Sequence, residues 1–179
     1  MRIISGTLKG KVIIAPGRLS ARPTTDFAKT GLFNILTNHF DFEEVSVLDL
    51  FCGTGNISYE FGSRGCRHLL AVDENHHVFN FVNETFKKLS LTKARIIRSD
   101  AFRFLKTCDD TFDIIFADPP FDSTTTDEIP GIVFEKKMLN KNGWLIVEHQ
   151  SKRKLEGELQ PVETRVYGNC AFSIYKNAD

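Results

Sequence analysis

Acidic residues that follow apolar runs are the first candidates for chemistry in this sequence. Asp49, Asp73 and Asp100 each stand at or just after the end of a short apolar segment, and Asp118 follows a fourth. If these segments are neighbouring parallel strands, their carboxyl ends meet at one edge of a sheet, where open α/β sheets bind ligands. The spacing therefore predicts one cleft lined by three carboxylates, with Asp118 at its mouth.

A glycine-containing turn, DLFCGTG at positions 49–55, follows the first of these runs. Its glycines allow a tight turn and the close approach of a ligand to the backbone, and the helix that follows offers free N–H groups. A dinucleotide-binding turn would carry a third glycine at the position of Ser58, and the charge of Asp49 would repel a pyrophosphate. The same charge suits a ligand with an ammonium and a sulfonium, such as S-adenosylmethionine. A plain tight turn is the alternative.

Two further acids have positions that suit an adenosyl group. Asp73 lies 20 residues after Gly53, where a carboxylate can accept both ribose hydroxyls of a nucleotide cofactor. Asp100 could accept the adenine amino hydrogen, with Phe102 near the ring. Each acid also has a structural alternative, because Asp73 could cap a helix ahead of Asn75 and Asp100 could be an N-cap.

The segment Asp118-Pro119-Pro120-Phe121 is the most specific of the four. Two consecutive prolines have a fixed φ and no N–H, so they hold a rigid corner after the strand. The Asp118 side chain and the Pro119 carbonyl could then accept the two N–H bonds of an exocyclic amine, whose lone pair becomes available as it attacks. Phe121 could stack on a base taken out of its helix. A plain turn after a strand is the alternative.

The elements that must position these residues follow from the alternation of apolar patterns. We expect strands at 45–50, 68–73, 94–98, 112–117, 144–148, 162–166 and 171–175. We expect helices after Thr24, after Gly55, over 78–89, over 101–106 and near 133–139. Strands that alternate with helices predict a parallel α/β sheet, with ligands beyond the carboxyl ends of the strands.

Length and composition favour one self-sufficient domain. The chain has 179 residues, of which 41% are hydrophobic, so it can bury a core without disulfides or a structural metal. Its four cysteines form no C-x-x-C pair, which argues against a zinc site and predicts free thiols and a cytoplasmic protein. Lysines interrupt the apolar residues near the start, and no apolar run approaches the length of a membrane span, so we expect neither secretion nor membrane insertion.

The charge is segregated although the formal net charge is +0. Residues 1–40 carry six lysines and arginines but a single acid, Asp26. We therefore expect a basic N-terminal arm over 1–22, on a body over 23–179, that lies outside the cleft and holds a polyanion. A solvated tail is one alternative, and packing of the apolar residues of 3–4 and 12–14 on the body is another. The candidate RNA-binding cations of the arm are Arg2, Lys9, Lys11, Arg18 and Arg22.

Taken in order, these motifs resemble a class I S-adenosylmethionine-dependent methyltransferase that methylates amines. The N-terminal segments RIISG at 2–6, KGK at 9–11 and RPTTD at 22–26, with LFN at 32–34, resemble more narrowly the bacterial RsmD family. That resemblance implies transfer of a methyl group to the exocyclic N2 of a guanine in 16S ribosomal RNA. It also implies a partly assembled small ribosomal subunit as the substrate. We expect a cytoplasmic monomer.

The resemblance also implies a fold and a set of site residues. The fold is a Rossmann-like seven-stranded sheet, mostly parallel with an antiparallel final strand, with helices on both faces and a basic arm. The catalytic residues would be Asp118 through Phe121, which hold the target amine, and no metal is implied. The cofactor-binding residues would be Asp49, Phe51, Cys52, Gly53, Thr54 and Gly55 for the methionyl and ribose side, Asp73 for the ribose, and Asp100 and Ala101 for the adenine.

The sequence departs from this pattern in the arm and at the start of the first helix. Many relatives carry arginines there, where this chain has Lys9, Lys11, Phe27, Ala28 and Lys29. Lysine keeps the charge but lacks the bidentate fork of arginine. Two other functions remain open at this point: an amino-methyltransferase acting on DNA or another RNA, and a catalytically silent RNA-binding assembly factor. DNA enzymes of this kind carry a sizeable target-recognition domain, for which 179 residues leave no room.

Overall fold

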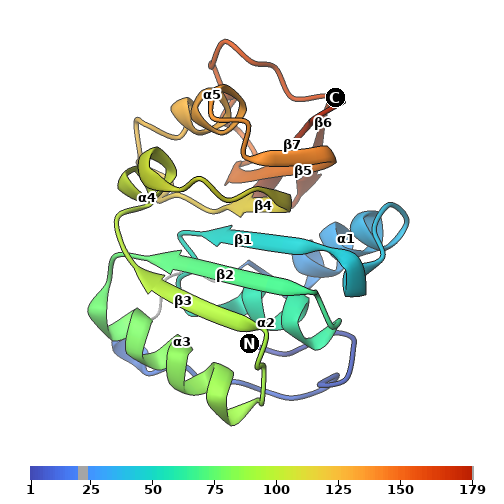
Figure 1. The fold of residues 1–179 in the computed structure, drawn as a ribbon, viewed down its shortest axis with the longest axis vertical. Helices are drawn as coiled ribbons and strands as arrows, with labels where there is room; N and C mark the ends of the chain where they lie inside the picture. The colour runs from blue at the N-terminus through green and yellow to red at the C-terminus, as the bar shows by residue number, and fades with distance from the viewer. Residues whose placement is uncertain (20–23, 179) are drawn as a thin grey trace.

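A computed structural model describes residues 1–19 and 24–178, and a seven-stranded sheet is its centre (Figure 1). The strand order is β3-β2-β1-β4-β5-β7-β6. The strands are β1 (Ser46–Leu50), β2 (His68–Asp73), β3 (Ala94–Arg98), β4 (Phe112–Ala117), β5 (Leu139–Gln150), β6 (Glu163–Tyr167) and β7 (Cys170–Lys176). The pairs among β1 to β5 are parallel, whereas β7 runs antiparallel to both β5 and β6. The predicted seven-stranded, mostly parallel sheet is thus confirmed.

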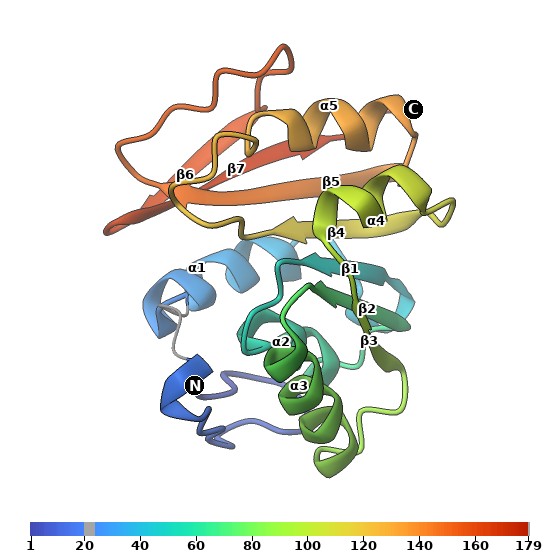
Figure 2. The ribbon, with the colours of Figure 1, turned by 90° about the vertical axis from the view of Figure 1, so that its left-hand side faces the viewer.

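Helices cover both faces of the sheet (Figure 2). They are α1 (Asp26–Thr37), α2 (Asn56–Ser63), α3 (His76–Lys88), α4 (Ala101–Thr107) and α5 (Glu128–Glu135), with short 3-10 helices η1 (Gly17–Leu19) and η2 (Phe42–Glu44). Successive residues of a strand point to opposite faces. Val47 of β1 therefore packs in the core shared by α1, α2 and α3, whereas Leu48 packs in the core shared by α4 and α5. None of the helices in the described ranges is long and apolar enough to span a bilayer.

The last helix is shifted from its predicted position. The apolar residues near 133–139 predict a helix there, but α5 begins at Glu128 and ends at Glu135, and Leu139 already belongs to β5. Pro130 lies in the first turn of α5, where a backbone N–H would have no acceptor within the helix, so the proline costs no helical hydrogen bond. Lys137 has a φ of 53°, which ends helical geometry before the strand. The prediction was wrong because the apolar run continues from the helix into the strand.

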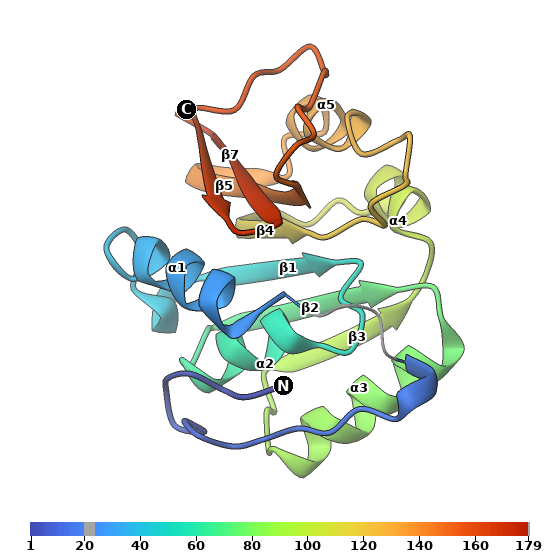
Figure 3. The same cartoon turned by 180° about the vertical axis from the view of Figure 1, so that it is seen from behind.

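The N-terminal arm packs on the body through α2 (Figure 3). Its two halves pair through an antiparallel bridge between Arg2 and Val12, and Ile3 is buried in the core. Gly6 has a φ of +82° and lies so close to the Ser63 carbonyl of α2 that a Cβ would clash with it. The arm is therefore no solvated tail. Packing on the body, one of the alternatives that the sequence leaves open, is what the structure shows.

A buried charged cluster fastens the arm. Glu60 of α2 is fully buried and accepts hydrogen bonds from the backbone N–H groups of Ile4 and Ser5 at 2.8 and 3.0 Å. Lys29 of α1 is also buried. Its Nζ lies 3.7 Å from Glu60 Oε2 and donates a hydrogen bond to the Arg2 carbonyl at 2.7 Å. Burial lowers the pKa of Lys29, and the negative charge of Glu60 opposes that shift. Removal of Glu60 would leave Lys29 without its ion-pair partner in the core, whereas Glu60 is also paired with Arg64 at 2.9 Å between Oε1 and Nη2.

Candidate active site

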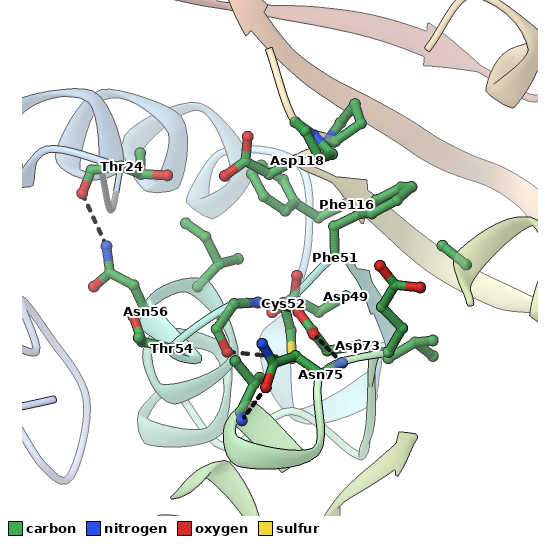
Figure 4. A pocket seen from close by; sticks show the side chains of 18 of the residues that line it. Thr24, Asp49, Phe51, Cys52, Thr54, Asn56, Asp73, Asn75, Phe116 and Asp118 are labelled. Carbon is green, nitrogen blue, oxygen red and sulfur yellow. Dashed lines mark hydrogen bonds between the residues drawn. The ribbon is translucent and has the colours of Figure 1, made fainter. Parts of the chain in front are cut away.

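A cavity of about 560 Å³ opens at the carboxyl ends of β1, β2, β3 and β4 (Figure 4). Its volume lies in the usual range for small-molecule sites. The predicted residues that line it are Asp49, Phe51, Cys52, Gly53, Thr54, Asp73, Asp100, Ala101, Asp118, Pro119, Pro120 and Phe121. Gly55 is not among the residues that line it, and neither is Phe102, which the sequence places near the adenine ring. The parallel register thus brings together four segments that span about 70 residues of sequence, as the acid spacing predicts.

The turn after β1 owes its shape to two glycines and one strained residue. Phe51, Gly53 and Gly55 all have positive φ, at 58°, 50° and 83°. Gly55 is the N-cap of α2, and a Cβ on it would lie 2.6 Å from the ring of Tyr59. Gly55 therefore shapes the turn from behind the cavity wall, because only glycine accepts both this backbone conformation and the close approach of Tyr59.

Asp73 joins the loops that follow β1 and β2. Its Oδ2 accepts a hydrogen bond from the Gly53 N–H at 3.0 Å, and its Oδ1 accepts one from the Asn75 N–H at 2.9 Å. Burial raises the pKa of Asp73, and these two backbone donors oppose the shift. The cap of α3 is Asn75, whose side chain accepts from His77 and Val78, so the alternative role of Asp73 as the helix cap is wrong. Asp73 remains in the cavity wall with lone pairs free for a ligand.

Asp100 combines the two roles that the sequence leaves open. It is the N-cap of α4, and its Oδ1 accepts a hydrogen bond from the Arg103 N–H at 2.8 Å. It also lines the cavity, together with Ala101. The ring of Phe102 lies against the ring of Phe51, with centroids 6.1 Å apart. This contact connects the turn after β1 with the start of α4, which follows β3.

Asp49 is a buried carboxylate at the floor of the cavity. Its side chain is 1% exposed and accepts a hydrogen bond from the hydroxyl of Ser58. The pKa of Asp49 is raised from 3.8 to about 7, mainly by burial; the charges of Asp73 and Glu148 contribute to this rise, and the Ser58 hydrogen bond opposes it. Ser58, which stands where a dinucleotide-binding turn would have its third glycine, is therefore the hydrogen-bond partner of Asp49.

Asp118 lies at the corner after β4, on the opposite side of the pocket from Asp73 and Asn75 (Figure 4). Its backbone N–H donates to the Leu50 carbonyl at 3.3 Å, and the Pro120 carbonyl accepts from Ser123 at 2.9 Å, which closes the turn. Within the described residues, no hydrogen bond reaches its carboxylate. Burial raises the pKa of Asp118 well above its ordinary value, and the charges of Glu148 and Asp49 add to the shift.

Sequence reasoning missed Thr24, Asn56 and Glu148. Thr24 and Asn56 line the cavity, and the Asn56 amide donates to the Thr24 carbonyl at 2.9 Å. The Thr24 hydroxyl donates to Glu148 Oε2 at 2.7 Å. A signal for Glu148 was present, because it ends the predicted strand 144–148 as Asp73 ends the strand 68–73. Thr24 and Asn56 carry no such signal, since their place in the cavity depends on long-range packing.

Three candidate RNA-binding residues of the arm, Arg2, Lys9 and Lys11, are not among the residues that line the cavity. All three are exposed, and Arg2 forms an ion pair with Asp26, with 3.3 Å between Nη2 and Oδ2. Arg18 falls in η1, and Arg22 lies outside the described residues. The expectation that the whole arm stays outside the cleft is wrong: Leu19 lines the cavity, and Met1 accepts a hydrogen bond from the Thr54 hydroxyl at 3.1 Å. Apolar residues of the arm, among them Ile3 and Leu19, are buried in the core and hold the described part of the arm against the body.

Solved structures of similar fold cover almost the whole chain. A hypothetical protein of Thermus thermophilus superposes with a TM-score of 0.85 and 24% identity over 97% of this chain and 98% of its own. A putative methyltransferase of Escherichia coli superposes with a TM-score of 0.84 and 26% identity over 99% of this chain and 97% of its own. An RNA methyltransferase of Salinibacter ruber in complex with S-adenosyl-L-homocysteine shares the fold, with a TM-score of 0.68 and 13% identity over 86% of this chain and 92% of its own.

Sequence comparison gives the family. The family model described as conserved hypothetical protein 95 matches residues 1–176. A putative rRNA methyltransferase of Bacillus subtilis, YlbH, is 35% identical over 183 residues, which cover 98% of each chain. Ribosomal RNA small subunit methyltransferase D of Escherichia coli (strain K12) is 30% identical over 185 residues, which cover 98% of this chain and 89% of its own. The resemblance that the motifs indicate is confirmed, and the chain belongs to the RsmD family, that of ribosomal RNA small subunit methyltransferase D.

Proposed function

We propose that this protein transfers a methyl group from S-adenosylmethionine to the exocyclic N2 amine of a guanine in 16S ribosomal RNA, within an assembling small ribosomal subunit. One observation carries the proposal: an acid-lined cavity ends at a rigid Asp118-Pro119-Pro120-Phe121 corner whose carboxylate lacks a hydrogen-bond partner among the described residues. The names of the relatives, which are rRNA methyltransferases, support the choice of RNA.

The charge of the cavity fits this cofactor. Its acidic lining residues are Asp49, Asp73, Glu74, Asp100 and Asp118, and no lysine, arginine or histidine is among the described residues that line it. A pyrophosphate would be repelled there, whereas an ammonium and a sulfonium would be attracted. Asp73 would hold the ribose hydroxyls, Asp100 and Ala101 the adenine, and the turn from Asp49 to Gly55 the methionyl end.

The reaction needs little from the protein beyond position and hydrogen-bond acceptors. S-adenosylmethionine, when bound, supplies a methyl group on a positively charged sulfur. The Asp118 carboxylate and the Pro119 carbonyl would accept the N–H bonds of the target amine, which favours the nitrogen as its lone pair leaves conjugation with the ring. Because the two prolines have fixed φ, both acceptors are in place before the amine arrives.

The outer surface suits a nucleic acid. Phe121 is 40% exposed at the edge of the cavity, where it can stack on a base that has left its helix. The exposed Arg2, Lys9 and Lys11 would attract RNA phosphates. In this proposal the protein acts as a cytoplasmic monomer on the subunit particle.

The test is to map the methyl group. Small subunits from a strain that lacks the protein would be incubated with the purified enzyme and S-adenosylmethionine that carries a tritiated methyl group, and the labelled nucleotide would be identified. We expect label on N2 of one guanine of 16S RNA, and far less label in the same time with an Asp118→Asn variant that still binds cofactor. Label on DNA, on 23S RNA or on another atom would replace this substrate assignment. No label on any nucleic acid, together with binding to the subunit, would favour a silent assembly factor.

A further inference from the structure

Glu148 is a buried acid beside the catalytic corner, and the sheet register puts it there. Ala117 of β4 pairs with Val147 of β5, so the next residue of each strand, Asp118 and Glu148, continue side by side. Alternation along the strands directs both to the same face as Phe116 and Ile146, which lie in the core under α1. Glu148 is 3% exposed and belongs to none of the ion pairs among the described residues.

The groups that face Glu148 come from four elements. The Thr24 hydroxyl, just ahead of α1, donates to its Oε2 at 2.7 Å, and the Cys170 thiol of β7 contacts its carboxylate. Asp118 after β4 and Asp49 of β1 are the charged neighbours, and both are acids. The carboxylate therefore accepts a hydrogen bond from the Thr24 hydroxyl and has no cation against it among the described residues.

A chain of buried hydrogen bonds holds Thr24 in this position. The Asn56 amide donates to the Thr24 carbonyl at 2.9 Å, and Lys29 Nζ donates to Asn56 Oδ1 at 2.8 Å. Lys29 in turn is fixed by Glu60 and the Arg2 carbonyl. Glu148 is thus held by the same network that fastens the arm.

We propose that Glu148 is a positioning residue for the methyl-transfer step, which keeps Asp118 basic enough to take the proton that the methylated amine releases. This inference rests on the proposed function, because it assigns Glu148 a part in the same reaction. It extends that function from the residues that touch the substrate to one that lies behind them.

The proton must leave the amine for the reaction to be complete. The amine nitrogen forms a bond to the methyl carbon while the carbon–sulfur bond breaks and leaves its electron pair on sulfur. The nitrogen then carries one N–H too many, and that proton passes to the Asp118 carboxylate and from there to water when the product leaves. A second negative charge beside Asp118 favours its protonated form, so Glu148 makes Asp118 the better acceptor.

The decisive variant is Glu148→Gln, which keeps an oxygen for the Thr24 hydroxyl but removes the charge. Carbon-13 labelling of the aspartate carboxyl groups, with Asp118→Asn for assignment, allows the titration of Asp118 to be followed by NMR without RNA or cofactor. We expect Asp118 to titrate about one pH unit or more lower in Glu148→Gln than in the wild type. The acid limb of the single-turnover methylation rate should move in the same direction. Glu135→Gln, on the exposed side of α5, should change neither.

An Asp118 titration that is unchanged or moves upward in a folded Glu148→Gln protein would overturn the inference. If that variant does not fold, Thr24→Val serves instead: loss of its donor makes Glu148 hold a proton more readily, and Asp118 should titrate lower by a smaller amount. An unchanged titration in Thr24→Val would likewise count against the inference. If the NMR shift is found but the wild type methylates no RNA, the proposed function fails while the coupling of the two acids stands.

Discussion

The Ser58 hydroxyl donates a hydrogen bond to Asp49 Oδ2 from the first turn of α2, and both side chains are buried, at 0% and 1% exposed. This contact links the end of β1 to the helix after the glycine turn. It supplies the one side-chain donor that the buried Asp49 carboxylate has among the described residues. The position that would admit a pyrophosphate in a dinucleotide site instead stabilises a negative charge, which selects a positively charged ligand.

The affinity for S-adenosylmethionine should rise with pH through about 7, because Asp49 titrates there and only its ionised form attracts the sulfonium and ammonium. Calorimetric titrations between pH 5.5 and 8 would measure this rise. Asp49→Asn should flatten the curve, and Ser58→Ala, which removes the donor that favours the charged form, should move the rise to higher pH. A flat curve for the wild type would contradict the assignment of Asp49.

The same group makes the stability of the cofactor-free protein depend on pH. The pKa of Asp49 is raised from 3.8 to about 7 in the folded state. Its contribution to the free energy of unfolding is therefore fully present below about pH 4 and is lost as the pH rises toward 7. Urea titrations of the wild type and Asp49→Asn across this window should differ in slope, and saturating cofactor should reduce the difference.

Asp73→Ala should weaken cofactor binding at least tenfold. Charge-assisted hydrogen bonds are worth about 1.5–3 kcal/mol each, and the carboxylate would make two to the ribose. The same change frees the N–H groups of Gly53 and Asn75, so the turn after β1 also loses its support. Calorimetry would give the affinity, and Asp73→Asn, which keeps one acceptor oxygen, should fall between the two proteins. Unchanged affinity in a folded Asp73→Ala protein would remove this residue from the site.

Asp118→Asn should lower the single-turnover rate of methyl transfer by about two orders of magnitude while leaving cofactor affinity nearly unchanged. The reason is that Asp118 would act on the amine in the transition state and has no contact assigned to the cofactor. Rapid-quench measurements on subunits with bound cofactor would report the rate, and calorimetry the affinity. Turnover at the wild-type rate would mean that the corner is only structural.

Replacing Arg2, Lys9 and Lys11 together by glutamine should weaken RNA binding without unfolding the protein, because all three side chains are exposed. If each neutralises one phosphate of single-stranded RNA, the plot of log affinity against log salt should become flatter by about 2. Filter binding at several salt concentrations would measure both slopes. Equal slopes would show that the arm carries these charges for another purpose.

This charge replacement is a better test than removal of residues 1–22. Truncation would take away the N–H donors of Ile4 and Ser5 from buried Glu60, and Leu19 from the cavity wall. A truncated protein would therefore lose stability and cofactor affinity even if the arm never touched RNA. The expectation from the sequence that the arm lies outside the cleft does not fit these contacts.

Local patterns predicted the strands and the candidate cleft well. The strands that end at Asp73 and Ala117 have the predicted bounds, since each is a short apolar run with a turn signal after it. Parallel pairing then places their carboxyl ends at one edge, and the cavity follows from that topology.

Long-range packing could not be predicted in the same way. The contacts of Glu60 with the arm and of Glu148 with Thr24 join residues 55 or more positions apart. No local periodicity encodes such pairs, and a buried glutamate has the same letter as an exposed one. The position of α5 was missed for a different reason, because one apolar run supplies both the end of the helix and the start of β5.

The attachment of the arm to α2 also has a consequence for the order of folding during synthesis. The arm is made first, but the contacts that hold it, to Glu60 and Ser63, lie 55 to 58 residues further along the chain. Residues 1–13 must therefore wait undocked until α2 has left the ribosome and formed on β1. Leu19 can therefore take its place in the cavity wall only after that delay. The start of the chain completes one wall of the ligand pocket by docking on a helix that is synthesised later.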